Sequence, residues 1–408
     1  MSFTEGFFWG AATSAHQVEG ANRGNDWWEE EVAGRLPFAS GEACRHRELY
    51  EADLDLARGL HHNAYRFSVE WSRVQPEPDR FDGAALEHYR SVVRACRARG
   101  LEPFVTLHHF TNPLWFARGG GWLAGDAPRV FARYVERVAR ALADVRHWIT
   151  INEPTVATVH GYVLGEWPPF ERRAWWRARK VLRHMARAHA LACRALRRTS
   201  EGALVGYAHS APWIVPCDPD RGRDRLAARL RDLAWNGLFP RWVAAQGGRG
   251  ERLLDFLGLN YYTRTLTRSQ GPGSGLLLGR ACRAAHHADL GPESAVGTEV
   301  FPPGLALVLE RFASLEVPLV VTENGVATDD EELRTATLHG HLAALARALA
   351  RGAPVRGYLY WSLLDNFEWR HGTNARYGLA AVDFATQERT LRPAAHAFAR
   401  VCRANALR

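Results

Sequence analysis

Two glutamates, Glu153 and Glu323, each follow a short apolar run that is typical of a buried strand. Glu153 lies in H-W-I-T-I-N-E-P, residues 147–154, and Glu323 lies in P-L-V-V-T-E-N-G, residues 318–325. A carboxylate is almost never buried alone, because removing its charge from water costs too much free energy. Two carboxylates at the ends of two strands therefore indicate a site, and a facing pair of carboxyl groups is the minimal equipment for glycoside hydrolysis.

The elements that must position these glutamates alternate between short apolar strands and amphipathic helices. In Glu331–Arg351 and in Ala84–Arg99, apolar residues recur every three or four positions and a glycine follows as a stop signal, which is typical of helices. We expect eight strands, at Phe7–Ala11, Ala64–Val69, Pro103–Leu107, Trp148–Ile151, Leu204–Ala208, Phe256–Asn260, Leu319–Thr322 and Tyr358–Trp361.

Eight strands that alternate with helices predict a parallel sheet covered by helices. Over 408 residues, this pattern fits an α/β fold with a closed (β/α)8 TIM barrel better than an open doubly wound sheet. No G-x-G-x-x-G dinucleotide signal follows the first strand, and the glycine-rich stretches at 119–121 and 271–279 are typical of loops. We expect residues 1–408 to form a single catalytic barrel domain.

Active sites of such barrels lie at the C-terminal ends of the strands. His108 and His109 are neighbours at one strand end, so one side chain should face the site and the other the barrel wall. Packing alone hardly explains why so many polar and aromatic residues follow the predicted strands. They are Arg66, His108, His109, Asn152, Glu153, Asn260, Tyr261, Tyr262, Glu323, Asn324, Trp361, Asp365, Glu368 and Trp369.

The two glutamates lie on the fourth and seventh strands, roughly across the barrel, so they can face each other over a sugar. Carboxyl groups about 5 Å apart indicate a retaining mechanism, and a gap of roughly 9 Å indicates inversion. Either glutamate alone could form a structural ion pair, as we expect for Glu70. Arg66 could hold one carboxylate ionised, and the negative charge would then raise the pKa of the other.

The charge pattern argues against a nucleic-acid or membrane partner. The net charge is +8, and Lys180 is the only lysine among 52 basic residues. The arginines recur at helical spacing, as in residues 129–140, rather than in one patch. The N-terminus does not resemble a signal peptide, and no run reaches the ~20 apolar residues of a membrane span. We expect a cytoplasmic protein.

No metal or other cofactor is expected from the sequence. The six cysteines are scattered and form no C-x-x-C pair, which argues against a zinc site or a disulfide scaffold and favours a reducing compartment. The histidines form no H-E-x-x-H or similar set of ligands.

Seven segments, in order along almost the whole chain, resemble glycoside hydrolase family 1, the β-glucosidase and β-glycosidase family. A string such as T-E-N-G is weak alone, but seven in order are very improbable by chance. The segments are F-F-W-G-A-A-T-S-A-H-Q-V-E-G (7–20), Y-R-F-S-V-E-W-S-R (65–73), T-L-H-H-F-T-N-P (106–113), T-I-N-E-P (150–154), G-L-N-Y-Y-T (258–263), V-T-E-N-G (321–325) and W-S-L-L-D-N-F-E-W (361–369).

The resemblance implies a role for each matching residue. Glu153 matches the acid/base and Glu323 the nucleophile, which Arg66 and Tyr262 support. The implied sugar contacts are Asn152 to the 2-hydroxyl, Gln17 and His109 to the 3- and 4-hydroxyls, Glu368 to the 4- and 6-hydroxyls, Trp361 as the platform under the ring, and Asn260, Tyr262 and Trp369 around it.

The resemblance also implies the reaction: a retaining, exo-acting β-glycosidase. The 6-phospho branch of the family has a small hydroxyl residue in place of Glu368 and a lysine nearby, so an unphosphorylated β-D-glucoside is the expected small-molecule substrate. β-Galactosides and β-fucosides remain open, as does the oligomeric state. Two further alternatives are a transglycosylase with the same residues and a sugar-binding relative without catalysis. Phe110 stands where many members have Trp, so one indole N–H near the sugar is missing, and a short loop around 165–171 puts the leaving-group preference in doubt.

Overall fold

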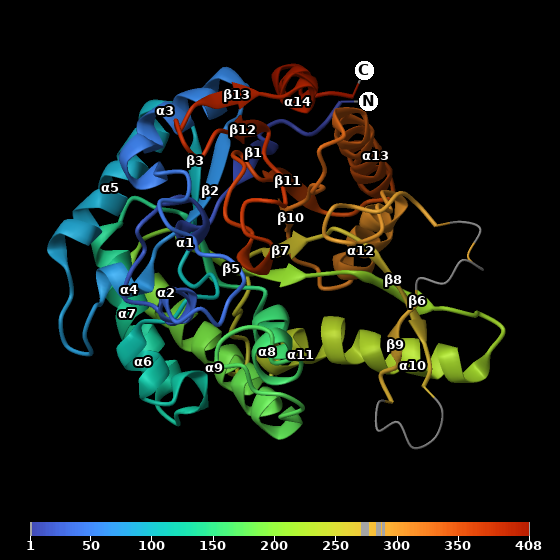
Figure 1. The fold of residues 1–408 in the computed structure, drawn as a ribbon, viewed down its shortest axis with the longest axis horizontal. Helices are drawn as coiled ribbons and strands as arrows, with labels where there is room; N and C mark the ends of the chain where they lie inside the picture. Colours follow the sequence, from blue (N-terminus) through green and yellow to red (C-terminus); the bar gives the residue numbers. More distant parts are fainter. Residues whose placement is uncertain (1, 271–276, 283–286, 288–289, 408) are drawn as a thin grey trace.

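Eight parallel strands close into a barrel, as the alternating sequence pattern predicts. The computed structural model describes residues 2–270, 277–282, 287 and 290–407. The barrel strands are β1 Phe8–Ala12, β2 Ala64–Ser68, β3 Glu102–Thr106, β4 His147–Asn152, β5 Leu204–Ser210, β7 Leu257–Asn260, β10 Leu319–Glu323 and β11 Val355–Trp361. They pair in the closed order β1-β11-β10-β7-β5-β4-β3-β2, and Figure 1 shows helices around them.

The eight predicted strands are therefore confirmed, with differences only at their ends. The largest shift is at β11, which begins at Val355 instead of Tyr358. β5 continues to Ser210, two residues beyond its predicted end, and this extension carries a polar residue to the rim. The glycine-rich stretch 271–279, predicted as a loop, falls largely outside the described residues.

Helices fill the connections between the strands, and most pack on the outside of the barrel. Those before β5 are α1 Ala15–Val18, α2 Asp26–Val32, α3 His46–Gly59, α4 Trp71–Val74, α5 Gly83–Ala98, α6 Leu114–Arg118, η1 Gly121–Leu123, α7 Ala127–Ala141, α8 Pro154–Tyr162 and α9 Trp175–Thr199. Those after β5 are α10 Gly222–Asp232, η2 Leu233–Gly237, α11 Leu238–Ala244, α12 Pro303–Ala313, α13 Glu331–Ala350, η3 Trp369–His371 and α14 Pro393–Ala404.

The two helices that the sequence predicts most clearly, α5 and α13, begin at side-chain caps. The Asp82 carboxylate accepts a hydrogen bond from the Ala85 amide (2.8 Å) at the start of α5, and Asp330 accepts one from the Leu333 amide (3.0 Å) at the start of α13. Such caps satisfy backbone donors that the first helical turn leaves free. The predicted apolar stripe of α5 is buried: Leu86, Tyr89, Val93 and Cys96.

The core has two layers that the closed sheet separates. One layer fills the barrel interior, and it includes Phe104, Ile149 and Phe256. The larger layer lies between the strands and the surrounding helices. Because side chains alternate between the two faces of a strand, each barrel strand contributes to both layers, and its last residues are left to point at the rim.

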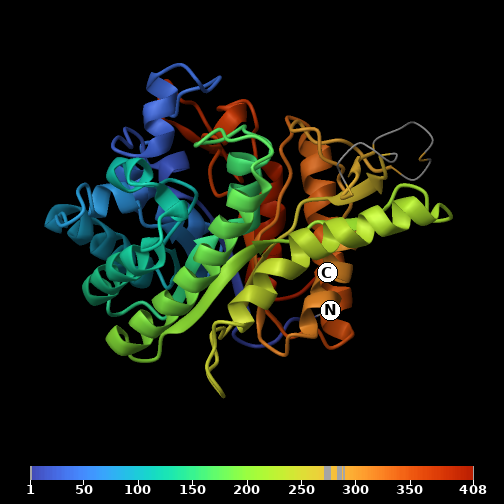
Figure 2. The same cartoon turned by 90° about the horizontal axis from the view of Figure 1, so that it is seen from below.

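Two small sheets lie outside the barrel. Strands β6 Trp213–Pro216, β8 Arg264–Arg268 and β9 Arg280–Ala281 form one, and β12 Ala380–Val382 pairs with β13 Arg389–Leu391 in the other. Figures 1 and 2 show that the first sheet and α10 project together from one side of the barrel. β6 begins shortly after β5 ends, and β8 shortly after β7, so this sheet is attached directly to the rim.

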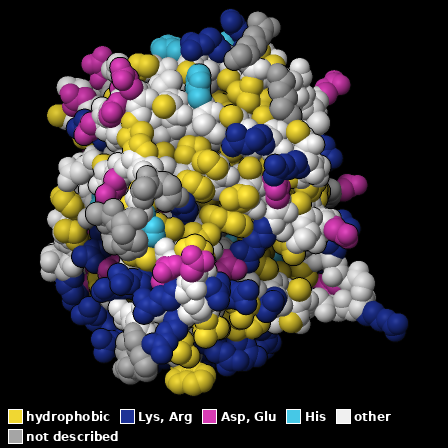
Figure 3. Space-filling model, turned by 90° about the vertical axis from the view of Figure 1, so that its right-hand side faces the viewer, with side chains coloured by type: hydrophobic (Ala, Val, Ile, Leu, Met, Phe, Trp, Pro, Cys, Tyr) yellow, Lys and Arg dark blue, Asp and Glu magenta, His cyan; other side chains and the backbone are white. Residues whose placement is uncertain are grey.

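Basic side chains are numerous on the side of the molecule that carries this projection. Figure 3 shows Lys and Arg gathered over the lower part of that face, with acidic side chains beside them. No helix in the described part of the chain is long and apolar enough to cross a bilayer.

Candidate active site

Glu153 stands at the junction of β4 and α8 in a strained conformation. Its φ and ψ of 43° and 58° lie in the left-handed region, which residues with a Cβ rarely adopt. Its amide donates to the Ala208 carbonyl of β5 (2.9 Å), and Pro154 begins the helix. The neighbouring strand and the helix together fix this backbone, which aims the buried side chain at the rim; such strain clusters at functional sites.

Glu323 is the last residue of β10, and two groups hold its buried carboxyl. The Arg66 guanidinium donates from Nη1 to Oε1 (2.6 Å), and the Tyr262 hydroxyl donates to Oε2 (2.8 Å). Arg66 also donates from Nη2 to the Asn152 amide oxygen (2.6 Å). Arg66 is fully buried, so it is committed to this position, and its charge favours the ionised form of Glu323.

The side chain of Asn260 connects the two glutamates. Its Nδ2 donates to Glu153 Oε1 (3.0 Å) and to Asn152 Oδ1 (3.1 Å), and its Oδ1 accepts from the Thr322 hydroxyl (2.6 Å) beside Glu323. Residues from four different strands therefore share one continuous hydrogen-bond network. Such a network fixes the orientation of each carboxyl before a ligand binds.

The same surroundings affect the protonation of the two carboxyls differently. Burial, and then the negative charge of Glu323, raises the pKa of Glu153 to about 8. Burial also raises the pKa of Glu323, but Arg66 and Tyr262 oppose that rise by stabilising the charged form. The proton is therefore favoured on Glu153, and the Arg66 ion pair favours the charged form of Glu323.

A second group of polar and aromatic residues lies near this pair. Trp361, at the end of β11, donates from Nε1 to Glu368 Oε1 (2.9 Å). The His109 ring lies nearly parallel to Trp361, with ring centroids 5.9 Å apart, and its Nε2 is 3.2 Å from Asn152 Nδ2. Burial lowers the pKa of His109 well below its usual value, so the ring is neutral. Trp369 is also nearly parallel to His109, at 6.4 Å.

Two further residues of the predicted rim, His108 and Gln17, make contacts with neighbouring loops. The His108 ring packs against Trp122, with centroids 5.2 Å apart, on the side away from His109, as strand geometry predicts. The Gln17 side chain accepts from the Ser14 hydroxyl (2.6 Å) and donates to the Asn366 side chain (2.9 Å). Gln17 is therefore held beside the loop that carries Glu368.

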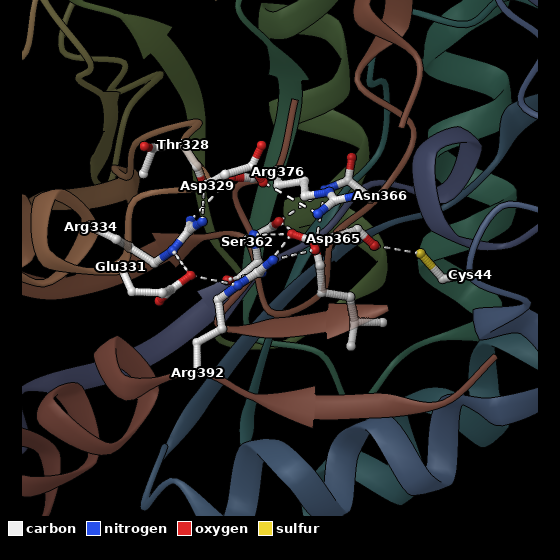
Figure 4. Close-up of polar contacts among 12 residues, drawn as sticks. Cys44, Thr328, Asp329, Glu331, Arg334, Ser362, Asp365, Asn366, Arg376 and Arg392 are labelled. Carbon is white, nitrogen blue, oxygen red and sulfur yellow. Dashed lines mark hydrogen bonds and ion pairs between the residues drawn. The ribbon is translucent and has the colours of Figure 1, made fainter. Parts of the chain in front are cut away.

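That loop, residues 362–368, is anchored by an ion-pair network that Figure 4 shows. Arg392 makes two bonds to Asp365, from Nη1 to Oδ1 (2.9 Å) and from Nη2 to Oδ2 (2.8 Å), and its Nε lies 2.9 Å from Glu331 Oε1. Within the loop, Asn366 Nδ2 donates to the Ser362 hydroxyl (2.9 Å). Helices α13 and α14 thereby fix the position from which Glu368 approaches the site.

Burial raises the pKa of Glu368 to about 8, and the charge of Glu323 adds to the rise. Hydrogen bonds to Trp361, Asn366 and Gln17 oppose this rise by stabilising the charged form.

Sequence reasoning missed several residues of the site. The Ser210 hydroxyl forms a hydrogen bond that lowers the pKa of Glu153, but the fifth strand was expected to end before it. Thr322 and Asn366 bond Asn260 and Gln17 but carry no signal of their own in the sequence. Tyr377 packs against Tyr262 with ring centroids 5.9 Å apart, and no motif in the sequence marks it.

Glu70, for which the sequence analysis expects a structural ion pair, is instead held by neutral hydrogen-bond donors. Its buried carboxylate accepts hydrogen bonds from Asn22 Nδ2 (2.7 Å), the Ser72 hydroxyl (2.6 Å) and the Thr111 hydroxyl (2.9 Å). These bonds cap α4 and tie it to two rim loops.

Two of the cysteines that are scattered along the sequence lie close together in the folded chain. Cys217, Cys282 and His287 lie together, with their sulfur and nitrogen atoms all within 4.8 Å of one another. The cysteines are 65 positions apart in the chain, and no spacing motif links them, so only the pairing of their strands with β8 reveals the cluster.

Comparisons with known proteins agree with this geometry. A family model described as glycosyl hydrolase family 1 matches residues 1–250 and 249–407. Thermostable β-glucosidase B of Thermobispora bispora is 34% identical over 457 residues, covering 100% of this chain and 92% of that protein. The structure of a β-glycosidase from Pyrococcus horikoshii has a TM-score of 0.91 at 39% identity, covering 99% and 95%.

A β-glucosidase from Thermotoga maritima, solved in complex with deoxynojirimycin, also has a TM-score of 0.91, at 28% identity and with 100% of both chains covered. Both the sequence and the barrel thus match the same group of enzymes over their full length. The chain belongs to glycosyl hydrolase family 1.

Proposed function

We propose that this enzyme is a retaining, exo-acting β-glycosidase that hydrolyses unphosphorylated β-D-glucosides through a covalent glycosyl-enzyme. The main support is that the two carboxyls have different surroundings. Arg66 and Tyr262 stabilise the charged form of Glu323, which could then attack, while the raised pKa of Glu153 keeps that carboxyl protonated. A retaining glycosidase requires one ionised carboxylate as the nucleophile and one protonated carboxyl as the acid. The single amide of Asn260, which contacts Glu153 and lies near Glu323, supports a short separation of the carboxyls.

In the first step, a carboxylate oxygen of Glu323 forms a bond to the anomeric carbon. The bond from that carbon to the leaving oxygen breaks, and Glu153 transfers its proton to that oxygen. In the second step, Glu153 takes a proton from water as the water oxygen attacks the anomeric carbon, and the bond to Glu323 breaks. Both carboxyls return to their starting protonation states, so the two steps consume one water molecule and require no cofactor.

The test is the stereochemistry of the first product. We expect an aryl β-D-glucoside to release β-glucose before mutarotation, because two inversions restore the original configuration. Proton NMR at early times distinguishes the anomers. α-Glucose as the first product would show inversion and overturn the roles given to Glu153 and Glu323, and a lack of turnover with any β-glycoside would overturn the proposal itself.

The pH profile provides a second prediction. Glu153 must be protonated to assist departure, so kcat/KM should fall as the pH rises through about 8. The measurement is kcat/KM between about pH 5 and about pH 10 for an aryl glucoside whose leaving group is weakly acidic. A 2,4-dinitrophenyl glucoside is the control: its leaving group needs no proton, so its alkaline limb should be much shallower. Equal limbs would assign that ionisation to another group.

The far end of the sugar pocket provides a third prediction. We propose that Glu368 contacts the 4- and 6-hydroxyls, so Glu368→Ala should lower kcat/KM for a β-D-glucoside about tenfold more than for the 6-deoxy-β-D-glucoside, which lacks only the 6-hydroxyl. The ratio of the two substrates cancels any general damage from the lost Trp361–Glu368 bond. An unchanged ratio would place the 6-hydroxyl elsewhere.

A further inference from the structure

Two thiols and an imidazole converge outside the active site, on the small sheet of β6, β8 and β9. Cys217 directly follows β6, and its amide donates to the Thr267 carbonyl of β8 (2.8 Å). Cys282 directly follows β9, and its amide donates to the adjacent Leu266 carbonyl (2.8 Å). The backbone of the central strand therefore holds both cysteines, one from each neighbouring strand.

The donor atoms lie as a metal ion would require. The Cys217 sulfur is 3.3 Å from His287 Nε2, and all three donor atoms are within 4.8 Å of one another. Zinc binds thiolate sulfur at about 2.3 Å and imidazole nitrogen at about 2.0 Å in a tetrahedron, which places such a pair of donors roughly 3.5 Å apart. Thiolate and imidazole are the donors that zinc prefers in structural sites.

Within the described residues, this sheet has only a small apolar cluster of its own, although β6 and β8 also contact α10. β9 has two residues, and the associated apolar cluster consists of the two cysteines and Leu266, with Val215 and Leu290 packed against it. Three short strands with so small a core are marginally stable by themselves. A metal ion that joins both outer strands would supply the missing stability, because the free energy of metal binding then contributes to folding.

We propose that Cys217, Cys282 and His287 bind one zinc ion as a structural site. A water molecule or one further donor would complete the tetrahedron. β6 follows the strand that carries Ser210, and β8 follows the loop that carries Tyr262, so the ion would brace the rim of the barrel beside the carboxyls without contacting the substrate.

The test is metal analysis of the full-length enzyme, purified without a polyhistidine tag. We expect one zinc per chain and its loss in Cys217→Ser, Cys282→Ser and His287→Ala. Cys402→Ser is the matched control, because Cys402 and Cys282 are equally buried (8% exposed); it should keep the metal. Cobalt substitution should give a thiolate charge-transfer band in the wild type that each ligand variant weakens or loses.

Two outcomes would overturn the zinc site. One is a chain without zinc that binds neither zinc nor cobalt after reduction. The other is a Cys217–Cys282 disulfide, revealed as two fewer titratable thiols in the denatured enzyme together with no metal. A ligand variant that does not fold is replaced by chelator treatment of the wild type, which should lower the midpoint of thermal unfolding and be reversed by added zinc; a midpoint that chelation leaves unchanged would also count against the site.

A cleft of about 380 Å³ lies beside the two carboxyls. Asn260 and Tyr262, which bond those carboxyls, are among the residues that line it. Arg231, on the last turn of α10, reaches this cleft, and its Nη1 is buried with no hydrogen-bond partner among the described residues. The adjacent Asp232 is already paired with Arg311 (2.7 Å between Nη2 and Oδ2). Burial lowers the pKa of Arg231.

The rest of the lining fits an aromatic anion. No Asp or Glu is among the residues that line the cleft; its other members include His160 and three aromatic side chains, Trp235, Tyr262 and Tyr377. Trp235 belongs to the π-helical turn η2, and its Nε1 donates to the Ser210 carbonyl (3.1 Å), which fixes the indole beside the site. Single π-helical turns are frequent at functional sites.

We infer that this cleft receives the leaving group and that Arg231 selects an aromatic carboxylate there. This inference depends on the proposed glycosidase function. The guanidinium has a buried donor to offer, and a carboxylate on the distal edge of a phenolic ring would satisfy it with a charge-assisted hydrogen bond. Arg231 is thus a specificity-determining residue rather than a catalytic one.

The test compares 4-carboxyphenyl β-D-glucoside with its neutral 4-carbamoylphenyl analogue. In Arg231→Gln the ratio of their kcat/KM values, acid over amide, should fall about tenfold relative to the wild type. Arg229→Gln, an exposed arginine on the same helix, is the matched control and should leave the ratio unchanged. The double ratio cancels the different acidities of the two phenols.

The outcomes distinguish a failure of the Arg231 role from a failure of the proposed glycosidase function. Normal hydrolysis of the amide with an unaltered ratio in Arg231→Gln would overturn the role of Arg231 and leave the glycosidase function intact. No hydrolysis of either glucoside would overturn the glycosidase function. In that case calorimetric binding of free 4-hydroxybenzoate, compared between wild type and Arg231→Gln, still tests the anion site, and equal affinities would rule it out.

Discussion

Glu323→Ala should lower kcat for an activated aryl β-glucoside by on the order of 10⁴-fold to 10⁶-fold, because no other group can form the covalent intermediate. Azide should then restore part of the rate by entering the space that the carboxylate leaves. Azide would attack the anomeric carbon from the side that Glu323 occupies, so the product should be the α-glucosyl azide. Kinetics with and without azide, and NMR of the product, check both expectations.

Two further variants make this result interpretable. Glu153→Ala should also respond to azide but give the β-glucosyl azide, since azide then attacks the glycosyl-enzyme from the opposite face. Glu70→Gln, which alters a buried glutamate with structural bonds only, should lower thermal stability and leave turnover nearly unchanged. The same azide anomer from both alanine variants would show that the two roles are not divided as proposed.

Arg66→Met should be the most disruptive single change outside the two glutamates. It leaves Glu323 buried without its cation, which typically costs about 3–5 kcal/mol of folding free energy. The pKa of Glu323 should also rise, because the charge that opposes the effect of burial is gone. Glu323 acts as a nucleophile only when ionised, so the acidic limb of kcat/KM should move to higher pH. Denaturant unfolding and a pH–rate profile measure the two effects.

Arg389→Met provides the matched control for that prediction. Arg389 is partly buried and makes two bonds to the buried Asp53, at 2.8 and 3.2 Å, but it joins the outer helix α3 to β13. Its loss should destabilise the fold to a similar degree without moving the acidic limb. If Arg66→Met does not fold, Arg66→Lys takes its place. The lysine keeps the positive charge but cannot donate to Glu323 and Asn152 from two separate nitrogens as Arg66 does. An unmoved acidic limb in a folded Arg66 variant would contradict the role of this arginine.

The sequence predicts the barrel and the pair of glutamates well for a physical reason. A buried parallel strand must be apolar over its whole length, so a polar residue directly after one, such as Glu153 or Glu323, is conspicuous. The same logic fails for Ser210: a small hydroxyl residue can end a strand anywhere, and the boundary was placed two residues early. Thr322 was missed because threonine inside a strand is ordinary.

Other features arise only from the folded chain. The raised pKa of Glu368 depends on its burial in the folded chain, which no local pattern encodes. The cluster around Cys217 requires strands that are distant in sequence to pair with β8. The unpaired donor of Arg231 depends on its neighbour Asp232 being committed to Arg311. Contacts between residues that are distant in sequence cannot be predicted from motif spacing or composition.

Closure of the barrel between β1 and β11 has a consequence for synthesis on the ribosome. Arg66 and Glu323 are separated by 257 positions, so at about 5–20 residues per second Arg66 is made roughly ten seconds to a minute before its partner. Until then the nascent chain carries an uncompensated cation and open sheet edges that invite aggregation. The ion pair between Arg66 and the proposed nucleophile can thus form only after residue 323 has been made, so this part of the rim is completed late in translation.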